Sequence, residues 1–134
     1  MKEVFDIASC IPQRPPFVFI DAIETVNETT ARTNYTVTKD CPLVTGDVLP
    51  LSGLLENMAQ TCAVQMGHME GGNRIGYIGA VKEMETHLLP GIGKTIATEV
   101  RLVQRVFNIC LMECTAFMDN EVIATATLKL ASAE

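Results

Sequence analysis

Glu56 is the residue best placed for chemistry, because it is the single carboxylate in residues 49–67, LPLSGLLENMAQTCAVQMG. Apolar residues in this stretch recur at intervals of three and four, which predicts one helix. The face that carries Glu56 otherwise holds small residues, an amide and a valine. Because a buried carboxylate is costly to ionise, we expect a raised pKa and acid–base chemistry at Glu56. A hydrogen-bonded structural carboxylate or a surface one is the alternative.

The two histidines and Asp47 are further residues able to move protons. His68 follows Glu56 by twelve residues, which is about 18 Å along a helix, so the two side chains cannot pair within one chain. His87 stands at the end of a predicted strand, which favours an edge or surface position. Asp47 lies just before the helix, whose positive end stabilises a charged carboxylate. Both a base and a capping role are open to Asp47.

Length, charge and cysteine content limit the classes of protein to which this chain can belong. The chain has 134 residues and a formal net charge of −6, which predicts one domain over residues 1–134 and argues against a nucleic-acid partner. No apolar run approaches the ~18 residues of a membrane span, and the start of the chain has no leader-like pattern. Five cysteines without metal-ligand spacing predict reduced thiols in a cytoplasmic protein, with neither a metal nor a cofactor.

The remaining chain alternates with a period of two, as strands do. We expect strands at residues 17–26, 29–38, 74–85, 94–107, 108–118 and 122–130. Since only one long helix is available to cover an antiparallel sheet, an α+β hot-dog fold follows, with a curved sheet wrapped around one long central helix. The helix's second face and the sheet edge would stay uncovered, which predicts a dimer. Gly76 and Gly79 indicate close approach by another backbone or a ligand.

Two segments resemble bacterial 3-hydroxyacyl-[acyl carrier protein] dehydratases. IPQRPPFVFIDAI at residues 11–23 is similar to their leucine-proline-histidine-arginine-X-proline-phenylalanine opening. LLENMAQTCAV at residues 54–64 resembles their central helix, where methionine-alanine-glutamine follows a glutamate, and the turn at residues 89–91 matches their proline-glycine turn. A short loop before the helix resembles the aryl-polyene branch more closely. The resemblance implies a hot-dog dimer that holds an acyl thioester, on acyl carrier protein or coenzyme A, in an interface tunnel.

In that family a glutamate and a histidine from opposite subunits eliminate water. The resemblance carries the glutamate onto Glu56 and the helix glutamine onto Gln60. The histidine has no counterpart here, because the loop before the helix contains none and the opening segment has Gln13 in its place. Glu56 is therefore the predicted catalytic residue. The predicted substrate-binding residues are Gln13, Asp47, Gly53, Gln60 and Gly79.

The resemblance implies an acyl-thioester-binding protein of fatty acid or polyene biosynthesis that lacks its own catalytic histidine. Two alternatives remain open. A hot-dog thioesterase would use Glu56, with N–H groups near Gly53 at the helix start holding the oxyanion. A non-catalytic subunit would instead complete a heteromeric dehydratase. The expected partners are the acyl thioester and a second copy of the chain or a related subunit, with neither nucleic acid nor a membrane.

Overall fold

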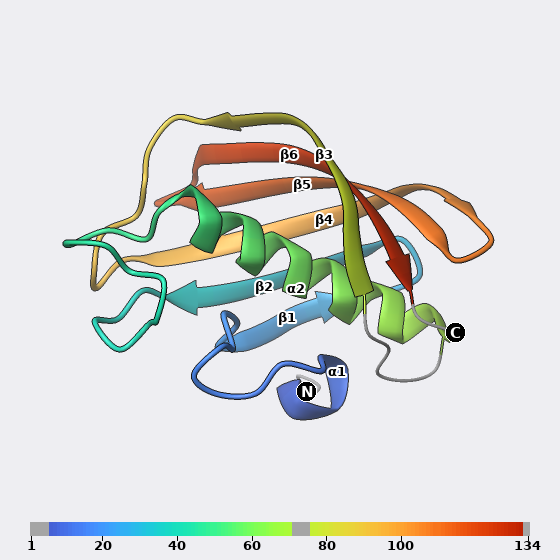
Figure 1. The fold of residues 1–134 in the computed structure, drawn as a ribbon, viewed down its shortest axis with the longest axis horizontal. Helices are drawn as coiled ribbons and strands as arrows, with labels where there is room; N and C mark the ends of the chain where they lie inside the picture. The colour runs from blue at the N-terminus through green and yellow to red at the C-terminus, as the bar shows by residue number, and fades with distance from the viewer. Residues whose placement is uncertain (1–5, 71–75, 133–134) are drawn as a thin grey trace.

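The computed structural model describes residues 6–70 and 76–132. Within these ranges, one long helix and a six-stranded antiparallel sheet confirm the predicted hot-dog fold (Figure 1). In chain order the elements are α1 (Ile7–Cys10), β1 (Ala22–Val26), β2 (Thr30–Thr36), α2 (Leu51–Glu70), β3 (Gly76–Thr86), β4 (Thr95–Val106), β5 (Ile109–Met118) and β6 (Glu121–Ser132). Neither helix in these ranges is long and apolar enough to cross a membrane.

The sheet has the strand order β1-β2-β4-β5-β6-β3, so β1 and β3 form its two edges. Asp119 and Asn120 join β5 to β6 with φ angles of 53° and 65°. Both angles lie in the left-handed region that a two-residue hairpin turn requires, and Asp and Asn tolerate it well. This two-residue turn agrees with the gap between the strands predicted at residues 108–118 and 122–130.

Helix α2 lies across the concave face of the sheet and shares one apolar core with it (Figure 1). On β4, Ile96, Thr98 and Val100 are fully buried, while the residues between them are more exposed, as the alternation predicts. The helix is buried on nearly all sides over residues 53–67, as the small residues, the amide and the valine on the face that carries Glu56 favour. Leu51 departs from it: this leucine of the predicted apolar stripe is 45 % exposed, because it stands in the first turn beside an open cavity.

The predicted strand at residues 17–26 is too long, since β1 begins only at Ala22. The Asp21 N–H bonds the Asn34 carbonyl of β2, but the backbone before it bonds side chains of α2. The Phe19 N–H donates to the Gln60 side-chain oxygen at 2.7 Å, and the Phe19 carbonyl accepts from the Asn57 amide at 2.7 Å. Because amide side chains from the helix satisfy these groups, the segment stays extended without joining the sheet.

Candidate functional site

Glu56 stands in the second turn of α2 and is half-buried. Burial raises the pKa of the Glu56 carboxyl, and a hydrogen bond with the Gln60 side chain partly offsets this increase. The direction confirms the prediction made from its small and apolar neighbours. A raised pKa keeps more of the carboxyl in its protonated form, which can donate a proton.

Gln60 fixes the surroundings of Glu56. Its buried amide accepts a hydrogen bond from the Phe19 N–H at 2.7 Å and donates one to the Phe17 carbonyl at 2.9 Å. The acceptor oxygen faces an N–H group, so the amide nitrogen is oriented toward the Phe17 carbonyl and has a second hydrogen for Glu56. Gln60 therefore ties the extended segment at residues 17–19 to the glutamate. A direct contact between Gln60 and substrate stays a prediction.

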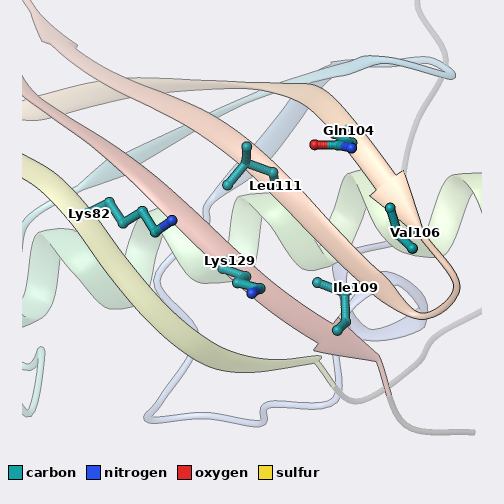
Figure 2. A pocket seen from close by; sticks show the side chains of 6 residues that line it. All are labelled: Lys82, Gln104, Val106, Ile109, Leu111 and Lys129. Atoms are coloured by element: carbon teal, nitrogen blue, oxygen red, sulfur yellow. The ribbon is translucent and has the colours of Figure 1, made fainter.

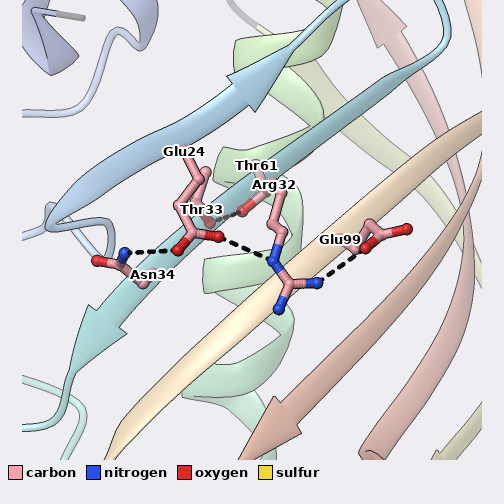
Figure 3. Close-up of polar contacts among 6 residues, drawn as sticks. All are labelled: Glu24, Arg32, Thr33, Asn34, Thr61 and Glu99. Carbon is pink, nitrogen blue, oxygen red and sulfur yellow. Dashed lines mark hydrogen bonds and ion pairs between the residues drawn. The ribbon is translucent and has the colours of Figure 1, made fainter. Parts of the chain in front are cut away.

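Two further polar pairs lock the rotation of α2, and sequence reasoning did not single them out. Thr98 on β4 donates to the Asn57 side-chain oxygen at 2.5 Å, and Thr61 lies 2.8 Å from Thr33 of β2 through their hydroxyl oxygens (Figure 3). All four side chains are fully buried. In the sequence, the sign of these bonds is that polar Asn57 and Thr61 stand on helix positions that otherwise pack inward. These bonds hold Glu56 at a fixed angle to the sheet.

The start of α2 is shaped by Pro50 and Leu49. The Pro50 carbonyl accepts hydrogen bonds from Gly53 N–H at 2.9 Å and Leu54 N–H at 3.1 Å. A side chain at Gly53 would overlap the fully buried Leu49 side chain, so glycine is needed there for packing. Since the Gly53 N–H already has an acceptor in this turn, its predicted substrate contact would require that bond to be shared.

Asp47 and Gln13 lie on the two loops where the resemblance to the dehydratases would place a catalytic histidine. The Asp47 carbonyl accepts from the Ile92 N–H at 2.9 Å, which docks the loop against the next turn and leaves the side chain exposed. The Gln13 side-chain oxygen is buried, and it has no hydrogen-bond partner within the described part of the chain. Beside it, one guanidinium nitrogen of Arg14 donates to the Gln13 carbonyl at 2.8 Å. An amide in this place cannot act as a base near neutral pH.

Neither histidine reaches Glu56 by a hydrogen bond or ion pair within residues 6–70 and 76–132. His68 lies in the last turn of α2 and is exposed. His87 follows β3 and is also exposed, as its predicted edge position implies. It lines a cavity of about 580 Å³ with Leu51, Thr86, Leu88 and Leu89, near the start of α2.

Gly79 sits beside an irregularity of edge strand β3 and is exposed. A Cβ added there would meet the Lys129 carbonyl oxygen at 3.5 Å, an ordinary contact distance. The chain's own packing therefore does not demand glycine here, and the predicted close approach by a ligand or a second backbone stays a prediction.

Cysteine and metal chemistry find little support in the described ranges. None of the five cysteines, all of which lie in the described ranges, is joined in a disulfide, and Cys62 and Cys114 bring their sulfur atoms to 3.6 Å in the core. Burial raises the pKa of the Cys62 thiol well above its ordinary value, so this thiol stays protonated and is a poor nucleophile. The described residues contain no group of three or more potential ligands that could hold a metal ion.

The six-stranded sheet with its long helix is a hot-dog fold, and the family comparison makes the chain a dehydratase-like hot-dog protein. Residues 5–134 match the ApeP-like family, described as ApeP dehydratase, and the chain belongs to this family. FabZ from Levilactobacillus brevis, a 3-hydroxyacyl-[acyl-carrier-protein] dehydratase, is 24 % identical over 130 residues, which span 92 % of this chain and 88 % of FabZ. The resemblance seen in the two sequence segments is thereby confirmed.

Solved structures show the same fold. A chain of the dehydratase heterocomplex ApeI:P from Xenorhabdus doucetiae has a TM-score of 0.90 at 18 % identity, over 98 % of this chain and 93 % of that one. The E. coli PaaI protein from the phenylacetic acid degradation operon has a TM-score of 0.68 at 14 % identity, over 81 % and 80 %. A hypothetical thioesterase with coenzyme A from Streptococcus pneumoniae has 0.68 at 12 % identity, over 83 % and 84 %.

Proposed function

We propose that this chain binds an acyl thioester and is the Glu56-bearing subunit of a 3-hydroxyacyl-thioester dehydratase completed by a second, related chain. Glu56 carries the proposal. Its carboxyl is half-buried on the central helix, is oriented by Gln60 and has a pKa raised by burial. Titratable groups perturbed in this way are typical of sites that transfer protons.

Dehydration breaks the C2–H and C3–O bonds, forms a C2=C3 double bond and releases the hydroxyl as water. The departing hydroxyl needs a proton, and the C2 proton needs a base. We assign the acid role to Glu56, because burial favours its protonated form. The Gln60 amide limits the movement of this carboxyl by tying it to the segment at residues 17–19.

A second chain would supply the base that this one lacks. Gln13 does not titrate near neutral pH, Asp47 is exposed on a docked loop, and His68 lies at the far end of the helix. The edge strand β3 exposes Ile78 and Val81, at 39 % and 41 %, which favours association along this edge. The name of the ApeI:P heterocomplex supports a related subunit as partner, and a second copy of the chain is the alternative.

The acyl thioester is carried by an acyl carrier protein in this proposal. The FabZ relative supports it, since its name specifies acyl carrier protein as the carrier of the 3-hydroxyacyl group. A coenzyme A thioester has the same reacting atoms and makes a practical substitute in an assay. Gln13, Asp47, Gly53 and Gly79 are proposed to line the substrate path.

The proposal is tested by assaying the chain alone and after co-purification with an ApeI-type subunit. Hydration of a crotonyl thioester, the reverse reaction, is followed by loss of the conjugated enoyl absorbance, and thioester cleavage is followed by free thiol. We expect hydration by the complex at least 10²-fold faster than by the chain alone, since a positioned base contributes about 10² to 10⁴ in rate.

Each of the other outcomes contradicts a different part of the proposal. Full hydration activity by the chain alone would show that a base within it, such as His87, has been overlooked. Thiol release that depends on Glu56 would replace the dehydratase with a thioesterase. Activity of the complex that is unaffected by Glu56→Gln would leave this chain as a structural subunit.

A further inference from the structure

The outer face of the sheet, opposite α2, is divided into two halves by its charges. On the half formed by β1, β2 and residues 99–101 of β4, Arg32 and Arg101 are matched by carboxylates. Arg32 bonds Glu24 at 2.8 Å and Glu99 at 2.9 Å, and its guanidinium lies between them in Figure 3. Further along the same face, Arg101 of β4 is paired with Glu113 of β5. This half is a self-neutralised polar surface.

The other half holds a cleft of about 350 Å³, which we name the lysine cleft. Its six lining residues are Lys82, Gln104, Val106, Ile109, Leu111 and Lys129 (Figure 2). Sheet register explains why they share one face. Gln104 is opposite Leu111, and Leu111 is opposite Lys129, so these three form one row across β4, β5 and β6. Directly opposed residues of antiparallel strands point to the same side.

The two cations of the lysine cleft have no counter-charge in the described part of the chain. Neither Lys82 nor Lys129 makes an ion pair or a side-chain hydrogen bond there, and no carboxylate lines the cleft. Glu83 and Glu113 line a neighbouring hollow of about 300 Å³ instead, where Glu113 is already bound to Arg101. In a chain with a net charge of −6, two unmatched lysines beside one cleft are a local exception.

The wall opposite the lysines is aliphatic. Val106 and Ile109 are 49 % and 39 % exposed, and they are register partners at the end of β4 and the start of β5. Figure 2 shows the lysines on β3 and β6, with the aliphatic side chains and Gln104 on β5 and β4. From β6 to β4 the cleft spans two strand spacings, about 10 Å. Positive charge and apolar surface thus lie at opposite sides of one concavity.

We propose that the lysine cleft binds an anionic amphiphile, a carboxylate that carries an unbranched aliphatic chain. The carboxylate lies between Lys82 and Lys129, and the chain covers Leu111 and the pair Val106 and Ile109. The volume lies within the range of small-molecule sites, which are typically apolar with a few polar groups that orient the ligand. This site is separate from Glu56, because α2 packs on the opposite face of the sheet.

Both parts of the ligand are needed on physical grounds. Exposed lysine–carboxylate pairs are weak, so a small carboxylate without a chain gains little from this cleft. A neutral chain of the same length covers the aliphatic wall but leaves the two ammonium groups without a counter-charge. Only a molecule with both features uses every side of the lysine cleft.

The test is an NMR titration of the isotope-labelled full chain with decanoate, decanol and acetate, below the concentration at which decanoate forms micelles. We expect decanoate to shift the backbone amides of Leu111, Lys129 and Ile109 in a saturable manner. Decanol and acetate should bind at least tenfold more weakly. The inference is overturned if decanoate shifts only residues near Glu56, or if acetate and decanol bind as well as decanoate does.

A charge-reversed pair of variants supplies the matched control. Lys82→Glu with Lys129→Glu should weaken decanoate binding at least tenfold. Lys39→Glu with Lys94→Glu makes the same change in net charge at exposed loop lysines outside the cleft and should alter binding less than twofold. Preserved amide dispersion shows that each variant is folded. Equal decanoate binding by both double variants would show that Lys82 and Lys129 do not hold the ligand, and would overturn the proposal.

Discussion

Neighbouring polar side chains of helix α2 differ in how many of their hydrogen-bonding groups find a partner within the chain. Asn57 and Gln60 are fully buried, and each both donates to a backbone carbonyl of the opening segment and accepts another hydrogen bond. Glu56, one residue before Asn57, is half-buried and interacts with Gln60. The amides hold the helix against the rest of the fold. The carboxyl has lone pairs and a proton left over, so it is the group available to a substrate.

The difference teaches how a site is supported in this fold. Burial of the amides costs little because each finds partners, whereas burial of the carboxyl raises its pKa because its charge is poorly compensated. Gln60 belongs to both groups, since it bonds the segment at residues 17–19 and also Glu56. The following predictions test whether the satisfied amides act on stability and the unsatisfied carboxyl on activity.

The largest effect is expected from Glu56→Gln in the proposed complex with a second subunit. Hydration of the crotonyl thioester should fall by about 10² to 10⁴, the usual contribution of a positioned acid or base. Denaturant unfolding of the chain should remain cooperative. Glu28→Gln, an exposed glutamate outside the site, is the matched control and should leave the rate unchanged. If the hydration rate of the Glu56→Gln variant lies within twofold of the parent, the carboxyl does not act on activity and the comparison with the amides fails.

Asn57→Ala should act on stability instead. It leaves the Phe19 carbonyl and the Thr98 hydroxyl without partners. We expect the free energy of unfolding to fall by about 2–6 kcal/mol, from roughly 1–3 kcal/mol for each of the two orphaned buried groups. Urea denaturation measures it. Adding Thr98→Val removes one orphaned group, so the double variant should lose less than the sum of the single losses. Strict additivity would contradict the proposed bond.

Gln60→Leu tests the residue that belongs to both groups. The buried Phe19 N–H loses its partner, which should lower the free energy of unfolding by about 1–3 kcal/mol. The Phe17 carbonyl also loses its bond, but that bond is only part-buried, so water can replace it. The pKa of Glu56 should rise further, since the hydrogen bond that lowers it is removed. Carboxyl NMR titration measures the pKa. If the pKa of Glu56 stays the same or falls in this variant, Gln60 does not stabilise the charged form of Glu56 and has no role in the site.

The smallest effect is a pH dependence of stability at Glu56. Because folding raises the pKa of this carboxyl, its ionisation costs the folded state stability. The cost is absent below the unfolded pKa of about 4.3, grows as pH rises toward the folded pKa and is constant above it. Glu56→Gln should therefore gain stability relative to the parent as pH rises through this window. Unfolding curves for both proteins across that range measure the gain, and a pH-independent difference would indicate a solvated carboxyl.

Local patterns predicted much of the framework. The apolar intervals of three and four placed the long helix, and the structure has it at Leu51–Glu70. Alternation by two placed the later strands to within a few residues, with the hairpin at Asp119 and Asn120. The burial of Glu56 followed from its neighbours on the helix surface. Such features depend on residues close together in the chain, so a sequence specifies them directly.

Tertiary structure alone decided the partners of the polar groups. Residues 17–19 belong to a predicted strand, yet the Phe17 carbonyl and both backbone groups of Phe19 bond Asn57 and Gln60, about forty residues further along the chain. Gly53 suggested an oxyanion site, whereas in the fold it makes room for the Leu49 side chain. The lysine cleft is formed from four strands that only the sheet order brings together. Hydrogen bonding and close packing depend on distances between remote residues, and no local period encodes those distances.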